Sequence, residues 1–175
     1  MAYLTGHWGS SVDSRRRLHV PADVGRYFSD ELRTTAVWVG HAAELECAVI
    51  LTPAGYEDLM KLFDDDTVMA TFDEGPCSNY LRHSLTSFRE EKITNGRIPI
   101  SEPVLRWAGI DPKEQEDSDD DSGVRVMVIG FGKKKLEIWD PEKYEKSRER
   151  GLAAPVFLRP PVREQVVTEL RPGVG

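Results

Sequence analysis

An internal repeat limits the possible folds of this 175-residue chain more than any other feature of its sequence. The segment RRLHVPADV at 16–24 aligns with GRIPISEPV at 96–104, and further along AVWVG…CAVILTPAGY corresponds to VMVIG…LEIWDPEKY. Self-similarity of this kind indicates two copies of one supersecondary unit. The aligned pairs are Arg17 with Arg97, Leu18 with Ile98, Val20 with Ile100 and Val24 with Val104.

The second copy differs from the first by an acidic insertion. The stretch from Arg97 to Pro141 is longer than the stretch from Arg17 to Pro53 by about the length of EQEDSDDDS. The segment DPKEQEDSDDD, which ends at Asp121, carries most of the formal net charge of -7. Since the rest of the chain is near neutral and its arginines are clustered, a local basic surface is compatible with an acidic total.

Each copy predicts the same order of elements: a short strand after a basic turn, a short helix, two strands joined by a turn, and a closing helix. Thr52-Pro53 and Asp140-Pro141 each pair an N-cap residue with proline at the first helical position. Ser101 is the expected cap of the short helix in the second copy. The expected strands are Leu18–Val20, Ile98–Ile100, Val124–Ile129 and Leu136–Trp139, with Gly130 and Gly132 in the last turn.

Copies of about 50 to 60 residues are too small to bury separate cores, so we expect them to share one. The predicted fold class is α+β, mainly β: a single pseudo-two-fold barrel in which strands of both copies interleave and hide the sheet edges. The expected parts are a first repeat at 6–60, a connecting helical segment at 61–88, a second repeat at 89–147 with the acidic insertion at 113–123, and a flexible Pro/Arg-rich tail at 148–175.

Three motifs of the chain occur together in one known family. The first turn has the pattern D-x-x-x-R, from Asp13 to Arg17, followed by LHVP; the second turn reads NGRIPI; and LEIWDPEKYE follows late in the second copy. Over roughly Gly6 to Glu145 the chain resembles MraZ, a family of bacterial regulators of the division and cell-wall gene cluster. The resemblance implies tandem AbrB-like (SpoVT-AbrB) modules forming a double swapped-hairpin barrel. It also implies a cytoplasmic, nucleoid-associated regulator, assembled as a homo-oligomeric ring, that binds repeats in double-stranded promoter DNA.

The two basic turns are the expected DNA-binding sites. An arginine fork can pair with guanine O6 and N7, while neighbouring arginines bind phosphates. Asp13 is the expected orienting acid for Arg17, whereas Ile93 stands where the family usually has Asp, so Arg97 lacks that anchor. Arg16 likewise stands where the family usually has Gly. The predicted DNA-binding residues are Arg15, Arg16, Arg17, Asn95, Gly96 and Arg97.

These departures and the acidic insertion also favour an alternative, a ring-forming protein-interaction module that has lost DNA binding. For the arginines alone, a solvated turn with one arginine paired to Asp13 is the simpler interpretation. The duplicated turn and the family resemblance together favour the DNA-binding hypothesis.

Other classes of protein are disfavoured by missing motifs. Cys47 and Cys77 lie far apart without metal-ligand spacing, and the acidic run lacks the Gly and Glu of a calcium loop. The histidines show no ligand spacing, and no Ser or Cys lies in a nucleophile motif. We therefore expect no enzyme activity, no cofactor, no metal and no small-molecule substrate. The sequence shows neither a leader peptide nor a membrane span, which favours the cytoplasm.

Overall fold

The computed structural model describes residues 3–42, 45–64, 83–112 and 123–153. The cysteine at 77, most of the predicted connecting segment, the acidic insertion up to residue 122 and the tail from 154 lie outside these ranges. The strands are β1 Gly6–Val12, β2 Arg17–His19, β3 Ala36–His41, β4 Ala48–Leu51, β5 Arg89–Lys92, β6 Arg97–Pro99, β7 Val124–Phe131 and β8 Lys135–Trp139. The helices are α1 Ala22–Arg26, which continues as the π-helix η1 Tyr27–Glu31, then α2 Pro53–Phe63, α5 Glu102–Ala108 and α6 Pro141–Ala153.

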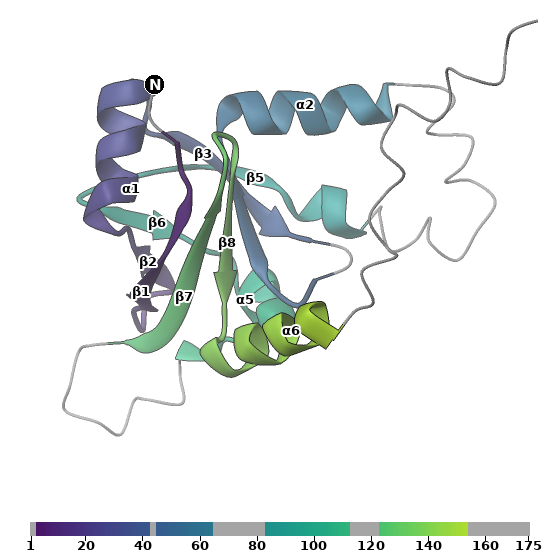
Figure 1. Cartoon of the computed structure of the whole chain (residues 1–175). Coiled ribbons are helices and arrows are strands. Elements are labelled where there is room, and N and C mark those ends of the chain that lie inside the picture. The colour runs from purple at the N-terminus through teal and green to yellow at the C-terminus, as the bar shows by residue number, and fades with distance from the viewer. Residues whose placement is uncertain (1–2, 43–44, 65–82, 113–122, 154–175) are drawn as a thin grey trace, which may run out of the picture. The chain divides into compact units, whose positions relative to one another are not determined.

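The strands form one antiparallel sheet of 8 strands in the order β5-β3-β4-β8-β7-β1-β2-β6 (Figure 1). The two strands at the ends of this order, β5 and β6, follow one another in the chain and are joined by a tight turn with a Thr94–Arg97 bridge. The sheet is therefore a nearly closed barrel with short helices at its margins. This confirms the prediction of an α+β, mainly β, barrel.

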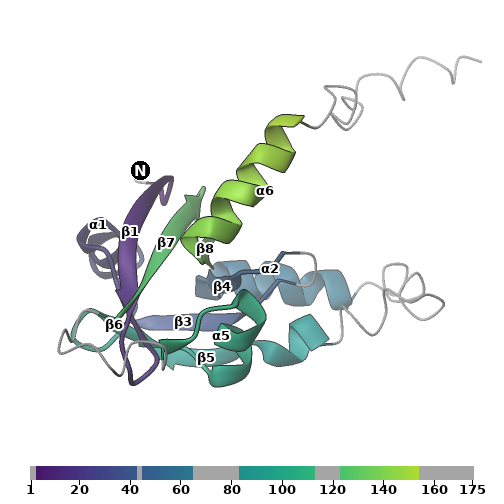
Figure 2. The ribbon, with the colours of Figure 1, turned by 90° about the horizontal axis from the view of Figure 1, so that it is seen from below.

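Strands from the two copies interleave throughout the sheet. β1 of the first copy pairs with β7 of the second from Gly6 opposite Gly130 to Val12 opposite Val124 (Figure 2). In the same way β5 of the second copy pairs with β3 of the first. Because most pairings join one copy to the other, neither copy could build this sheet alone.

The register agrees with the repeat seen in the sequence. β2 pairs with β6 so that Leu18 lies opposite Ile98, and these are the residues that the repeat aligns. When the order is read around the barrel through the turn between β5 and β6, each strand keeps equivalent neighbours after it is exchanged for its counterpart in the other copy. Equivalent residues therefore meet where equivalent strands pair.

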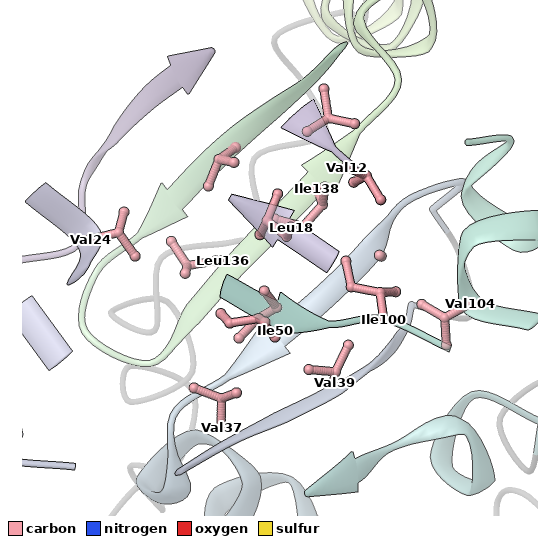
Figure 3. Packing of buried hydrophobic residues seen from close by; sticks show 14 of the residues in the cluster. Val12, Leu18, Val24, Val37, Val39, Ile50, Ile100, Val104, Leu136 and Ile138 are labelled. Carbon is pink, nitrogen blue, oxygen red and sulfur yellow. The ribbon is translucent and has the colours of Figure 1, made fainter. Parts of the chain in front are cut away.

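The core fills the inside of the sheet with side chains of both copies. Figure 3 shows buried residues of the two copies pointing toward one another. Burying one such aliphatic side chain contributes about 1.5 to 3 kcal/mol, so the shared core is the main source of stability. A second buried cluster consists of Cys47, Val49, Leu51, Ile129 and Trp139, with Tyr56 and Leu59 of α2 packed on it.

The predicted helix starts agree with the structure except for one cap. The Thr52 side-chain oxygen accepts a hydrogen bond from the backbone N–H of Gly55 at 3.1 Å, which caps α2. Asp140 caps α6 in the same way, accepting from two backbone N–H groups at 3.0 Å. Ser101 precedes α5, but its side chain makes no cap hydrogen bond.

The hairpin between β7 and β8 corrects one detail of the sequence prediction. Gly132, with φ of 67°, lies in the turn as expected. Gly130 instead lies within β7, where its missing side chain lets the backbone of Leu4 approach. Gly130 is therefore a strand glycine that allows another segment of backbone to approach closely, and not a turn residue.

The chain divides into two compact units, Met1–Tyr144 and Glu145–Gly175. The first contains the complete sheet. The predicted boundaries of the two repeats stay a prediction. Among the described helices, none combines the length and the apolar character needed to cross a bilayer.

Candidate nucleic-acid interface

The first basic turn is a tight hairpin between β1 and β2. The Asp13 N–H donates to the Arg17 carbonyl at 3.0 Å, and the Arg16 N–H donates to the Asp13 carbonyl at 2.8 Å. Arg16 has φ of 60°, the left-handed conformation that usually closes a hairpin loop of this length. That conformation favours glycine, because a side chain there costs about 1 to 2 kcal/mol. A glycine at position 16 would therefore relieve this cost.

Asp13 holds Arg17 through both of its carboxylate oxygens. Asp13 Oδ1 accepts from the Arg17 backbone N–H at 2.9 Å, and Oδ2 accepts from Arg17 Nε at 2.9 Å and lies 2.8 Å from Nη2. The Asp13 side chain is 7% exposed and that of Arg17 is 31% exposed. The carboxylate therefore fixes one edge of the guanidinium, while part of the arginine side chain remains open to solvent.

The surroundings of Asp13 favour its ionised form. Burial by itself raises the pKa of this carboxyl. Hydrogen bonds from the Arg17 side chain and backbone, the charge of Arg17 and a hydrogen bond from the Arg15 backbone together outweigh burial, so the pKa lies below its usual value. Asp13 thus remains charged, and keeps its hold on Arg17, at neutral pH.

The second turn has a different geometry. Asn95 and Gly96 have φ of 51° and 69°, as in a two-residue type I′ hairpin. Ile93, at the place equivalent to Asp13, packs against the core, and its N–H donates to the Thr35 carbonyl at 2.8 Å. Within the described ranges no salt bridge to Arg97 is found. The turn therefore forms without a carboxylate that could hold its arginine.

The structure does not bring the six predicted DNA-binding residues into one cluster. Because β2 and β6 are antiparallel, the residues of the first turn lie at one end of this strand pair and those of the second turn at the other. Each turn instead contacts the other copy: the Ile100 N–H donates to the Arg16 carbonyl and the Val20 N–H to the Gly96 carbonyl, both at 2.8 Å. The first turn thus lies beside the start of α5, and the second beside the start of α1.

A groove of about 670 Å³ lies between the first turn and α5. Arg15 and Arg16 line it from the turn, and Glu102 and Arg106 line it from the helix. Glu102 Oε2 lies 2.8 Å from Arg16 Nη1, and Glu102 Oε1 lies 2.8 Å from Arg106 Nη2. With Asp111 also in the lining, three cations face two carboxylates, which leaves the groove with a small positive charge.

Sequence reasoning missed Glu102 and Arg106. A usable signal was present, since the repeat places Arg106 at the position equivalent to Arg26 and puts both at the end of the short helix. What the sequence could not show is that α5 of the second copy lies beside the turn of the first copy. That placement depends on the pairing of β2 with β6.

The described residues on either side of the stretch 113–122 both lie near the first turn. Pro112, directly before it, lines the groove. Gly123, directly after it, lies so close to the backbone of Val12 that an added Cβ would be 2.9 Å from the Val12 carbonyl carbon. The residues between, 113–122, lie outside the described ranges.

Other residues that could carry chemistry have structural partners. Cys47 is fully buried, and burial raises the pKa of its thiol, so it is a poor nucleophile. In the hairpin between β7 and β8, Lys134 forms an ion pair with Asp58, and Lys135 forms one with the buried Glu137 at 2.8 Å. Across the described part of the chain, no group of three or more His, Cys, Asp or Glu is arranged to hold a metal ion.

Comparison with known proteins assigns no family to the chain. No family model matches it, and no curated protein matches it. The geometry of the first turn and its groove is therefore the basis for a functional hypothesis.

Proposed function

We propose that the chain is a sequence-specific, DNA-binding transcriptional regulator of MraZ type and not an enzyme. It is cytoplasmic and nucleoid-associated, acts on promoter repeats of the division and cell-wall gene cluster, and assembles as a homo-oligomeric ring. One observation carries the proposal: Asp13 accepts hydrogen bonds from both the backbone and the side chain of Arg17. The same turn exposes Arg15 and Arg16 to solvent.

The exchange of strands between the copies supports the finer part of the fold prediction. In an AbrB-like swapped-hairpin barrel, each copy contributes strands to the sheet of the other. β1 pairs with β7 and β5 pairs with β3, which is the exchange that such a barrel requires. We therefore interpret the barrel as a double swapped-hairpin fold of two tandem AbrB-like modules.

The first turn has the chemistry needed to recognise a base pair. A guanidinium held along one edge can present its other N–H groups to guanine O6 and N7, and such a bidentate pair contributes about 1 to 3 kcal/mol of discrimination. Holding Arg17 in advance reduces the entropy lost on binding. Because Arg97 has no such carboxylate, we expect the first turn to contribute more sequence discrimination than the second.

The test is binding to a duplex from the region upstream of the gene, measured by fluorescence anisotropy at several salt concentrations. Changing Arg15, Arg16 and Arg17 together to alanine should weaken binding at least tenfold and remove the preference over an unrelated duplex. A matched control removes three positive charges from exposed positions of α6, Lys146, Arg148 and Arg150. The control should keep the sequence preference.

Two outcomes would contradict the proposal. Unchanged affinity and preference in the triple-arginine variant would reject the site. No salt-dependent binding by the unaltered protein would reject DNA binding, and it would favour the alternative of an interaction module if light scattering still showed a ring. A monomeric mass at micromolar concentration would reject the ring.

A further inference from the structure

Glu102 joins two arginines from different copies of the repeat. Its two carboxylate oxygens accept one guanidinium each, from Arg16 on the turn and from Arg106 on the next turn of α5, both at 2.8 Å. The side chains of Arg16, Glu102 and Arg106 are 47%, 48% and 78% exposed. A guanidinium has five N–H donors, so most donors of both arginines remain available to a ligand.

The charge of this cluster matches one phosphodiester group. Two guanidiniums and one carboxylate leave a single positive charge, and the carboxylate keeps the guanidiniums apart on its two sides. Arg16 and Arg106 both line the groove, next to Arg15. Arginine forks bind phosphate oxygens with fixed geometry, which suits them to hold a nucleic-acid backbone in register.

We propose that Arg16 and Arg106, held by Glu102, bind one phosphate of the DNA backbone beside the bases contacted by the first turn. This inference rests on the proposed function and adds a helix of the second copy to the DNA-binding surface. Glu102 is a positioning residue in this site, and Arg106 is a phosphate-binding residue. The first turn and α5 form one composite site, although they are far apart in the sequence.

The equivalent place in the other half of the sheet does not have this cluster. There the turn supplies Gly96, which has no side chain, and α1 has Ala22 where α5 has Glu102. Arg26, equivalent to Arg106, pairs instead with Asp23, and both line a separate cleft of about 290 Å³ that also contains Asp30 and Glu31. This cleft is acidic overall, which disfavours phosphate. Arg26 is therefore a matched control for Arg106.

The experiment measures how duplex affinity depends on salt for the full chain and for three variants: Arg106→Ala, Arg106→Lys and Arg26→Ala. Each phosphate contact adds about -0.9 to the slope of log K against log salt, or about a 3.5-fold loss of affinity between 50 and 200 mM salt. Arg106→Ala should make the slope shallower by this amount. It should weaken binding to the promoter and to an unrelated duplex by the same factor, because a phosphate carries no sequence information.

The two remaining variants should keep the slope of the unaltered protein. Arg106→Lys retains the positive charge, and Arg26→Ala changes a residue that we do not expect to contact DNA. Arg106 is highly exposed, so its substitution should leave the fold intact, which circular dichroism would verify. If the unaltered protein binds and Arg106→Ala has the same slope, this inference is rejected while the proposed function stands. An equal change in slope for Arg26→Ala would also reject it. If the unaltered protein binds no duplex, both proposals are rejected.

Discussion

Replacing Asp13 with asparagine tests the geometry of the first turn directly. Asparagine has nearly the same shape, and its oxygen can still accept from the Arg17 backbone N–H. Its amide NH₂ would then face Arg17 Nε and Nη2, which now lie 2.9 and 2.8 Å from a carboxylate oxygen. Hydrogen bonds to charged groups contribute about 1.5 to 3 kcal/mol each when buried, and the partial exposure of Arg17 reduces this. We expect Asp13→Asn to lower the free energy of unfolding by about 2 kcal/mol at neutral pH.

The effect should depend on pH with a defined sign. The pKa of Asp13 is lowered in the folded state, while an unfolded aspartate has a pKa of about 3.9. The stabilisation by ionised Asp13 is therefore complete above the unfolded pKa and is lost as pH falls through the folded pKa. Asparagine does not titrate. The difference in stability between the two proteins should be constant from about pH 5 to 8 and should shrink below about pH 4.

Urea unfolding followed by tryptophan fluorescence at a series of pH values measures this difference. With a denaturant slope of about 2 kcal/mol/M, the midpoint should fall by about 1 M at pH 7. Asp23→Asn is the control, since Asp23 pairs with Arg26 at the surface, and its midpoint should be unchanged. Equal midpoints for Asp13→Asn and the unaltered protein at pH 7 would refute the reasoning. A difference that persisted in full well below the folded pKa would do the same.

Three further predictions concern backbone strain, charge and burial. Arg16→Gly should be more stable than Arg16→Ala by about 1 kcal/mol in urea unfolding, because both remove the guanidinium and only glycine relieves the left-handed conformation. Under the proposed function, replacing the acids within 113–121 by asparagine and glutamine should raise affinity for any duplex at low salt in anisotropy titrations, because it removes most of the negative charge of the chain. Burial lowers the pKa of His41, so the unaltered protein should lose stability as pH falls below about 6.5. His41→Phe keeps a ring stacked on Trp107 and should show a smaller loss between pH 7.5 and 5 in thermal unfolding.

The arrangement of the sheet could be predicted from the sequence to the extent that it follows from the repeat. Alternating apolar residues identify β2 and β6, and the alignment of Leu18 with Ile98 is compatible with their pairing. Because each copy is too small to bury a core of its own, the sequence predicted one core shared by the two copies, and the structure has such a core. Local signals also sufficed for the starts of α2 and α6, where proline follows a capping side chain.

What could not be predicted depends on contacts between distant parts of the chain. Glu102 and Arg106 follow an ordinary helical i, i+4 pattern, and only the docking of the Arg16 carbonyl on Ile100 brings them to the first turn. Gly130 was misplaced because the approach of Leu4 is not visible in the local pattern. α6 runs from Pro141 to Ala153, across residue 148 where the predicted tail begins.

The covalent link between the copies affects how the two turns can change. If a single copy built the same sheet from two chains, it would be a symmetric dimer, and every substitution would appear in both turns at once. In the linked chain the positions of Asp13 and Ile93 are equivalent but differ, as do those of Arg16 and Gly96. Linkage also makes the pairing of the copies independent of protein concentration. Each turn is then free to specialise, and under the proposed function a DNA site recognised by one chain need not be a palindrome.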